Sequence, residues 1–162
     1  MGRWLRPDSH SESVYTIHLR ALVARGIRGV ILDLDNTLVP WGARAAPPEL
    51  VAWIASGRRE GLRFCIVSNN RGARVTQLAA ALGVPAVAGA LKPRRGALRR
   101  ALSVMGTIPQ TTALVGDQLF TDILGGNRLG LHTILVRPQS PKEFLLTRLV
   151  RRVERRFLGG RR

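Results

Sequence analysis

The stretch GVILDLDNT at residues 29–37 carries the main information about the fold. It begins with the uninterrupted apolar run GVIL, and two acids, Asp33 and Asp35, follow. An apolar run without alternation is typical of a strand that is covered on both faces, as in a parallel α/β sheet. Ligands bind such sheets beyond the carboxyl ends of the strands. The stretch therefore predicts a buried strand with a polar site at its end.

Apolar runs alternate with helix-like segments along the rest of the chain. We expect further strands at residues 62–67, 86–88, 113–115 and 132–136, and helices at residues 19–25, 48–60, 72–82, 95–105 and 121–129. Pro48 near a helix start, and Gly61 and Gly83 just past helix ends, fit the usual preferences of these residues. The alternation predicts an α/β fold built on a parallel sheet.

A second acidic group follows the strand expected at residues 113–115. The chain has only ten acidic residues, and Asp117 and Asp122 stand close together after this strand, as Asp33 and Asp35 do after the first. Residues two apart on a strand point the same way, so the first pair is expected to face one site. Crowded carboxylates repel one another unless a cation neutralises them. A divalent ion with oxygen ligands fits, and Mg²⁺ is usual for phosphate substrates. Taken alone, an Asp-x-Asp pair also fits a calcium loop or a surface turn.

Two other segments offer groups that bind phosphate. Ser68, Asn69 and Asn70 follow the strand at residues 62–67, and the Ser68 hydroxyl and the backbone N–H groups after it can donate to phosphate oxygens. Lys92 is one of two lysines and precedes Pro93 in a predicted loop. Its compact charge can stabilise a nucleophile and a transferring phosphoryl group.

These four elements, in this order, resemble the haloacid dehalogenase (HAD) superfamily of phosphatases. The resemblance covers residues 29–136, and the combination DNT, SNN, KP and GDQxxTDxxGGNR resembles a narrower branch. That branch holds small subfamily IIIA enzymes of the bacterial YqeG type, related to phosphatidylglycerophosphate phosphatases. The resemblance implies a Rossmann-like three-layer core with helices on both faces of the sheet. About thirty residues separate Thr37 from Ser68, which leaves no room for an inserted cap domain.

The resemblance also implies a mechanism and a set of roles. Asp33 attacks phosphorus and becomes an aspartyl-phosphate, while Asp35 acts as general acid and then as general base. The expected phosphate ligands are Ser68, Asn69, Asn70 and Lys92, and the expected Mg²⁺ ligands are Asp33, Asp35 through its backbone carbonyl, Asp117 and Asp122. Asp122 binds the ion either directly or by orienting its waters.

Composition limits the cellular setting and the partners. The net charge is +16, which attracts nucleic acid, acidic lipid head groups or phosphate substrates. Cys65 is the only cysteine, so no internal disulfide forms and a buried thiol is expected. No run is long enough to span a membrane and no signal peptide is apparent, so a cytoplasmic protein is expected, with peripheral contact to the membrane as one alternative. Trp53 is expected in the core. Trp41 either lines the site entrance or has a simple packing role.

The chain divides into a phosphatase domain over residues 1–140 and a basic tail over residues 141–162. Residues 142–162 hold eight basic and two acidic residues. An amphipathic helix over residues 141–157 fits either binding to an anionic membrane or packing on the sheet. RNA binding is less favoured, because aromatic residues for base stacking make up 5% of the chain.

Three hypotheses about function follow. The first is hydrolysis of a lipid phosphate such as phosphatidylglycerophosphate. The second is the same chemistry on a nucleic-acid, protein or metabolite phosphate. The third is a non-catalytic protein that binds RNA or the ribosome, and the presence of both Asp33 and Asp35 argues against it.

Overall fold

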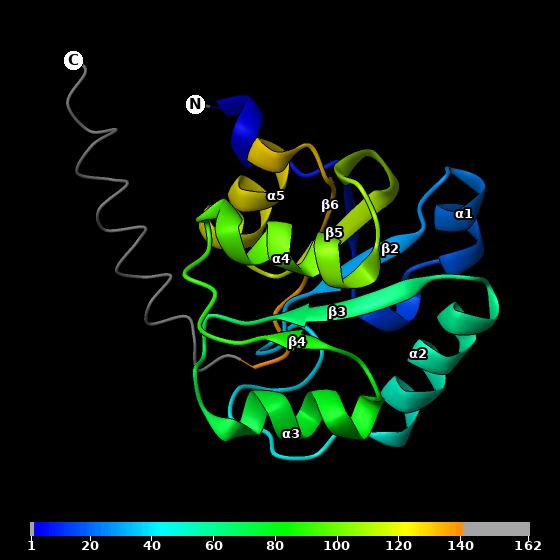
Figure 1. Ribbon diagram of the computed structural model, residues 1–162, viewed down its shortest axis with the longest axis vertical. Helices are drawn as coiled ribbons and strands as arrows, with labels where there is room; N and C mark the ends of the chain where they lie inside the picture. The colour runs from blue at the N-terminus through cyan, green and yellow to red at the C-terminus, as the bar shows by residue number, and fades with distance from the viewer. Residues whose placement is uncertain (1, 141–162) are drawn as a thin grey trace.

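The computed structural model describes residues 2–140, and a single parallel sheet organises them (Figure 1). The strand order is β1-β6-β5-β2-β3-β4. The bounds are β1 Ser9–Ser11, β2 Gly29–Leu32, β3 Arg63–Val67, β4 Ala86–Val87, β5 Thr112–Gly116 and β6 His132–Val136. The stretch that opened the sequence analysis therefore forms the central strand β2, which pairs with β3 on one side and β5 on the other.

Helices cover both faces of the sheet. Their bounds are α1 Leu19–Ala24, α2 Pro48–Arg59, α3 Ala73–Leu82, α4 Arg95–Met105 and α5 Leu124–Leu129. Short helical turns are η1 Gly2–Leu5, η2 Val14–Thr16, η3 Pro109–Thr111 and η4 Leu119–Ile123, of which η4 is a π-helical turn. Figure 1 shows α4 and α5 on one face of the sheet and α2 and α3 on the other. The predicted three-layer arrangement is confirmed.

The central strand is buried on both sides, as its apolar run predicts. Val30 and Leu32 belong to the core cluster that includes α2 and α3 residues, whereas Ile31 belongs to the cluster beneath α4. Successive strand residues point to opposite faces, so β2 joins the two halves of the core. The predicted burial of Cys65 and of Trp53 is confirmed, and the Trp53 ring packs on Phe64.

Helix ends follow the residues that predict them. Pro48 is the first residue of α2, and Gly83 ends α3 with a φ of 63°. Glycine adopts this left-handed conformation without steric strain. The loops that follow β2 and β3 are short, over residues 33–47 and 68–72, and neither holds an inserted domain.

The structure differs from the expected elements in two places. The edge strand β1 was not predicted, because residues 9–11 read Ser-His-Ser and show no apolar pattern. It is held by pairing with β6, next to Asp8, whose carboxylate accepts a 2.7 Å hydrogen bond from the Thr133 N–H. The helix expected over residues 121–129 divides into η4 and α5. The helix expected over residues 141–157 lies outside the described residues, and within residues 2–140 no helix is long and apolar enough to cross a membrane.

Candidate active site

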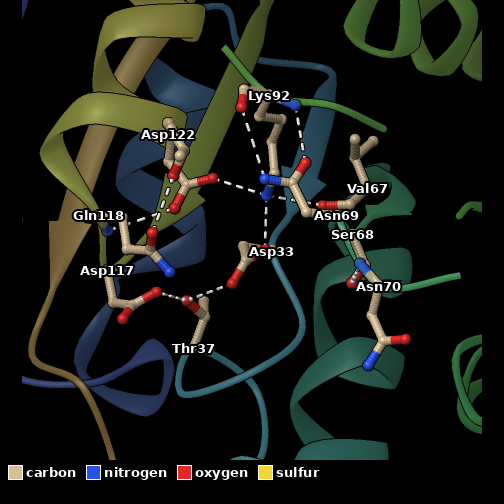
Figure 2. A network of polar contacts seen from close by, with 11 residues as sticks. Asp33, Thr37, Val67, Ser68, Asn69, Asn70, Lys92, Asp117, Gln118 and Asp122 are labelled. Carbon is tan, nitrogen blue, oxygen red and sulfur yellow. Dashed lines mark hydrogen bonds and ion pairs between the residues drawn. The ribbon is translucent and has the colours of Figure 1, made fainter. Parts of the chain in front are cut away.

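The polar residues selected from the sequence meet at one edge of the sheet. Asp33 follows β2, Ser68 follows β3 and Asp117 follows β5, and these three strands are parallel neighbours. The Asp33 N–H donates to the Val115 carbonyl at 2.9 Å, which carries the sheet pairing one residue past β2. Lys92 enters from the loop between β4 and α4. Figure 2 shows how closely these side chains gather.

The Lys92 ammonium group lies at the centre of the cluster. Its Nζ lies 2.5 Å from Asp33 Oδ1 and 2.6 Å from Asp122 Oδ1, and it donates to the Val67 carbonyl at 2.9 Å. The Lys92 N–H donates to Asn69 Oδ1 at 2.7 Å, which fixes the backbone of its loop. Burial lowers the pKa of Lys92, but the two carboxylates more than offset this effect and raise it. Lys92 therefore stays charged at neutral pH.

Asp33 is buried among groups of both signs. Its Oδ2 accepts a 3.2 Å hydrogen bond from the Thr37 hydroxyl, which also lies 3.1 Å from Asp117 Oδ1. Burial is the largest influence on its pKa and raises it to about 7, with Lys92 acting to lower it and Asp122 to raise it. The Asp33 carboxyl is thus costly to ionise while no other cation is close to it.

The acidic cluster has the composition of a divalent metal site. Carboxylate oxygens of Asp33, Asp117 and Asp122 lie within 4.8 Å of one another. When ionised, these carboxylates place three negative charges close together, and Lys92 contacts two of them, Asp33 and Asp122. Oxygen ligands and a local charge of this size suit Mg²⁺, so the residues present fit the ion that the family resemblance implies. Both Asp122 oxygens have partners, since Oδ1 lies 2.6 Å from Lys92 Nζ and Oδ2 accepts from the Gln118 N–H at 3.3 Å.

Asp35 points to a different partner. Its carboxylate forms a half-buried ion pair with the guanidinium of Arg74, in the first turn of α3. The same guanidinium donates to the Ala43 carbonyl at 2.8 Å. The expectation that Asp33 and Asp35 share a strand face does not apply, because β2 ends at Leu32 and Asn36 then turns the chain with a φ of 62°.

The segment after β3 is arranged around backbone hydrogen bonds. Ser68 is buried, and its Oγ accepts from the Asn70 N–H at 3.1 Å, which leaves the hydroxyl hydrogen available to a ligand. The Asn69 side chain is bound to the Lys92 backbone, and Asn70 Oδ1 accepts from the Gly72 N–H at 3.0 Å. Both asparagine side chains therefore shape the loop.

Sequence reasoning assigned no role to Thr37 or Arg74, two residues that contact the site. Thr37 stands two residues after Asp35 and bridges Asp33 to Asp117. Its position in the DNT motif was a usable signal. Arg74 gave no such signal, because it is one of 24 arginines and its ion pair joins positions 39 residues apart.

The comparisons with known proteins agree with this geometry. The HAD-hydrolase-like family matches residues 89–146. The chain is 40% identical over 160 residues to the probable phosphatase YqeG of Bacillus subtilis, which covers 99% of this chain and 93% of that protein. It is 30% identical to phosphatidylglycerophosphate phosphatase 1 of Chlamydomonas reinhardtii over 82% of this chain, and it spans about half, 52%, of that protein's length.

A solved structure shows the same fold at low sequence identity. The cobalt-bound deoxy-D-mannose-octulosonate 8-phosphate phosphatase of Haemophilus influenzae superposes with a TM-score of 0.58 at 16% identity, over 74% of each chain. At this identity the likeness concerns the fold alone. The high coverage of the Bacillus relative, together with the fold and the ordered motifs, establishes that the chain belongs to the YqeG-type branch of the HAD phosphatases.

Proposed function

We propose that this phosphatase hydrolyses phosphate monoesters in two steps with Asp33 as the nucleophile. The observation that carries the proposal is the pairing of Asp33 Oδ1 with Lys92 Nζ at 2.5 Å inside a cluster of carboxylates. A buried carboxylate held by one ammonium group and one hydroxyl has a fixed direction of attack, which favours covalent catalysis. Residues 1–140 are the proposed catalytic unit.

In the first step a carboxylate oxygen of Asp33 forms a bond to phosphorus and the bond from phosphorus to the leaving oxygen breaks. Asp35 donates a proton to that oxygen from its Oδ2, while its Oδ1 keeps the ion pair with Arg74 that sets the position of the carboxyl group. In the second step Asp35 accepts a proton from water, which attacks phosphorus, and the Asp33 carboxylate is regenerated with release of phosphate. Lys92 supplies positive charge beside the transferring group, and the Ser68 hydroxyl donates to a phosphoryl oxygen.

Magnesium is the proposed cofactor. Asp33, Asp117 and the backbone carbonyl of Asp35 are the proposed ligands, and Asp122 positions Lys92 and ligand waters. When bound, the ion supplies positive charge that offsets the negative charge of the phosphate and of the carboxylates. Thr37 keeps Asp33 and Asp117 at a fixed separation, since its hydroxyl lies within hydrogen-bond reach of both.

The proposed substrate is a lipid phosphate, and phosphatidylglycerophosphate is the first compound to test. The similarity to an enzyme named for that substrate supports the proposal, as does the net charge of +16, which favours anionic surfaces. The basic segment at residues 142–162 is proposed to add attraction to an anionic membrane.

Phosphate release from a generic aryl phosphate tests the chemistry. Asp33→Asn should abolish Mg²⁺-dependent hydrolysis by at least about a thousandfold, because it removes the nucleophile. Glu49→Gln, which changes an exposed acid on α2, is the matched control and should keep wild-type activity. Full activity of Asp33→Asn would refute the proposed nucleophile. A parallel screen of phosphatidylglycerophosphate, nucleotides and sugar phosphates then ranks the substrates, and absence of hydrolysis on all of them would favour an RNA-binding role.

A further inference from the structure

Some exposed apolar side chains lie on the segments that carry the proposed active-site residues. Among residues 2–140, seven large hydrophobic side chains are more than a third exposed: Tyr15, Trp41, Val51, Leu91, Val104, Ile108 and Leu119. Three of these, Trp41, Leu91 and Leu119, are called the mouth residues below. Their exposed fractions are 59%, 47% and 37%.

Each mouth residue comes from a different segment next to the site, and Leu119 is the first residue of η4. Trp41 lies in the loop that begins with Asp33, Leu91 directly precedes Lys92, and Leu119 stands two residues after Asp117. These segments leave the carboxyl ends of β2, β4 and β5, so they share one edge of the sheet. Isolated exposed hydrophobic residues are ordinary on protein surfaces. Three on separate segments around one capless site indicate a surface that meets an apolar partner.

The exposed charges in and directly beside these segments are positive. Exposed arginines lie in or directly beside the same loops: Arg44, Arg71, Arg94 and Arg95. Within the loop residues 33–47, 68–72, 88–94 and 117–118 no carboxylate is exposed, since Asp33 is buried and Asp35 and Asp117 are half-buried. Apolar side chains interspersed with arginines match the interface of an anionic bilayer, where tryptophan is favoured at the head-group level.

The described part of the chain also ends beside this surface. The Gln139 N–H donates to the Asn36 carbonyl at 3.0 Å, and its side-chain amide donates to the Thr37 carbonyl at 2.8 Å. Ser140 Oγ lies 2.9 Å from Asn36 Oδ1. The described chain therefore ends next to the loop that carries Asp33, and residues 142–162 have a net charge of +6 in the sequence.

We propose that the mouth residues dock the enzyme on an anionic lipid bilayer, with the open site facing the head groups. The proposal rests on the proposed phosphatase function and identifies the surface through which a membrane-bound phosphate ester reaches Asp33. Trp41 and Leu119 enter the interface, and the arginines between the loops contact anionic head groups. A capless site then needs no lid of its own, because the bilayer surface covers it.

Vesicle binding by the full chain tests the docking surface. The probes are phosphatidylcholine vesicles with and without phosphatidylglycerol, measured by co-sedimentation. Trp41→Ser/Leu119→Ser should weaken binding to the anionic vesicles by about tenfold or more, because it removes most of the inserted apolar area. Val104→Ser/Ile108→Ser is the matched control: Val104, 55% exposed, lies in the last turn of α4, and Ile108, 57% exposed, lies between α4 and the start of β5, away from the carboxyl ends of the strands. The control pair should bind as wild type does.

A second measurement follows Trp41 directly. Brominated phospholipids should quench the wild-type tryptophan fluorescence, and Trp41→Phe should remove the quenched component. Three results would each overturn the proposal: wild-type binding by Trp41→Ser/Leu119→Ser, absence of quenching, or no vesicle binding by the wild type. Vesicle binding that does not depend on the mouth residues would be attributed to the tail, and absence of vesicle binding would point to a protein partner for this surface. Hydrolysis of a soluble aryl phosphate is measured separately. Its absence in the wild type would refute the phosphatase chemistry without testing the docking surface.

Discussion

Asp33 gives the metal-free enzyme a pH dependence of stability that can be worked out from its surroundings. Burial raises its pKa from an ordinary 3.8 to about 7. The folded carboxyl therefore binds its proton more tightly than the unfolded one, so its contribution to stability is fully present below pH 3.8 and is lost as the pH rises through about 7. The difference between the two pKa values corresponds to about 4 kcal/mol of unfolding free energy.

Asp33→Asn should reverse this loss. In the presence of a chelator at about pH 8, the variant should be more stable than the wild type by up to about 4 kcal/mol, and at about pH 5 the two should differ much less. Saturating Mg²⁺ should restore the wild type at the higher pH, because the ion replaces the missing positive charge, and should leave the variant nearly unchanged. Urea unfolding followed by circular dichroism measures the unfolding free energy of both proteins under each of these conditions.

Glu49→Gln provides the control, since this exposed acid has no buried charge to relieve. Its difference from the wild type should not change with pH. The reasoning would be refuted if the difference between Asp33→Asn and the wild type were the same at both pH values. That result would mean that Lys92 alone neutralises Asp33 and that the cluster has no excess negative charge for a cation to balance.

Three other substitutions test the supporting contacts. Gly116→Ala should lower kcat by about a hundredfold or more, because the added Cβ would lie 2.4 Å from Asp122 Cγ and displace the carboxylate that holds Lys92; a wild-type kcat would contradict this role. Lys92→Met should lower kcat by about a thousandfold while raising the pKa of Asp33, which NMR titration of the metal-free protein detects. Arg74→Gln should lower kcat about tenfold with little change in KM, and Arg74→Lys should recover part of the loss, because only the alignment of Asp35 is affected. Equal kcat values for both Arg74 variants would count against a positioning role.

The sequence predicted the location of the site better than its internal contacts. Asp33, Ser68 and Asp117 were expected together because each follows an apolar strand, and parallel strands end at the same edge. Lys92 stands further from the end of the short strand that precedes it, β4, which ends at Val87. Its rarity in an arginine-rich chain and the family resemblance identified it, and the structure brings its Nζ to 2.5 Å from Asp33.

The direction of the Asp35 side chain could not be predicted from local pattern. It depends on the left-handed backbone at Asn36, a conformation that asparagine tolerates but that the sequence does not require. It also depends on Arg74, which reaches Asp35 only after the chain has folded through α2 and β3. The edge strand β1 escaped prediction for the same reason, since the hydrogen bond that anchors it joins Asp8 to Thr133 across 125 positions.

The surface arginines and the acidic site have separate electrostatic effects. Surface arginines raise the local concentration of anions around the mouth, but their field is screened within about 8–10 Å at physiological salt. Exposed charges of this kind cannot neutralise the buried carboxylates of Asp33 and Asp122, which both contact Lys92. Removing surface arginines should therefore weaken the capture of an anionic substrate or membrane. It should not change the metal concentration that activity requires. The proposed divalent cation would act inside the cluster, where the oxygens of three carboxylates lie within 4.8 Å of one another.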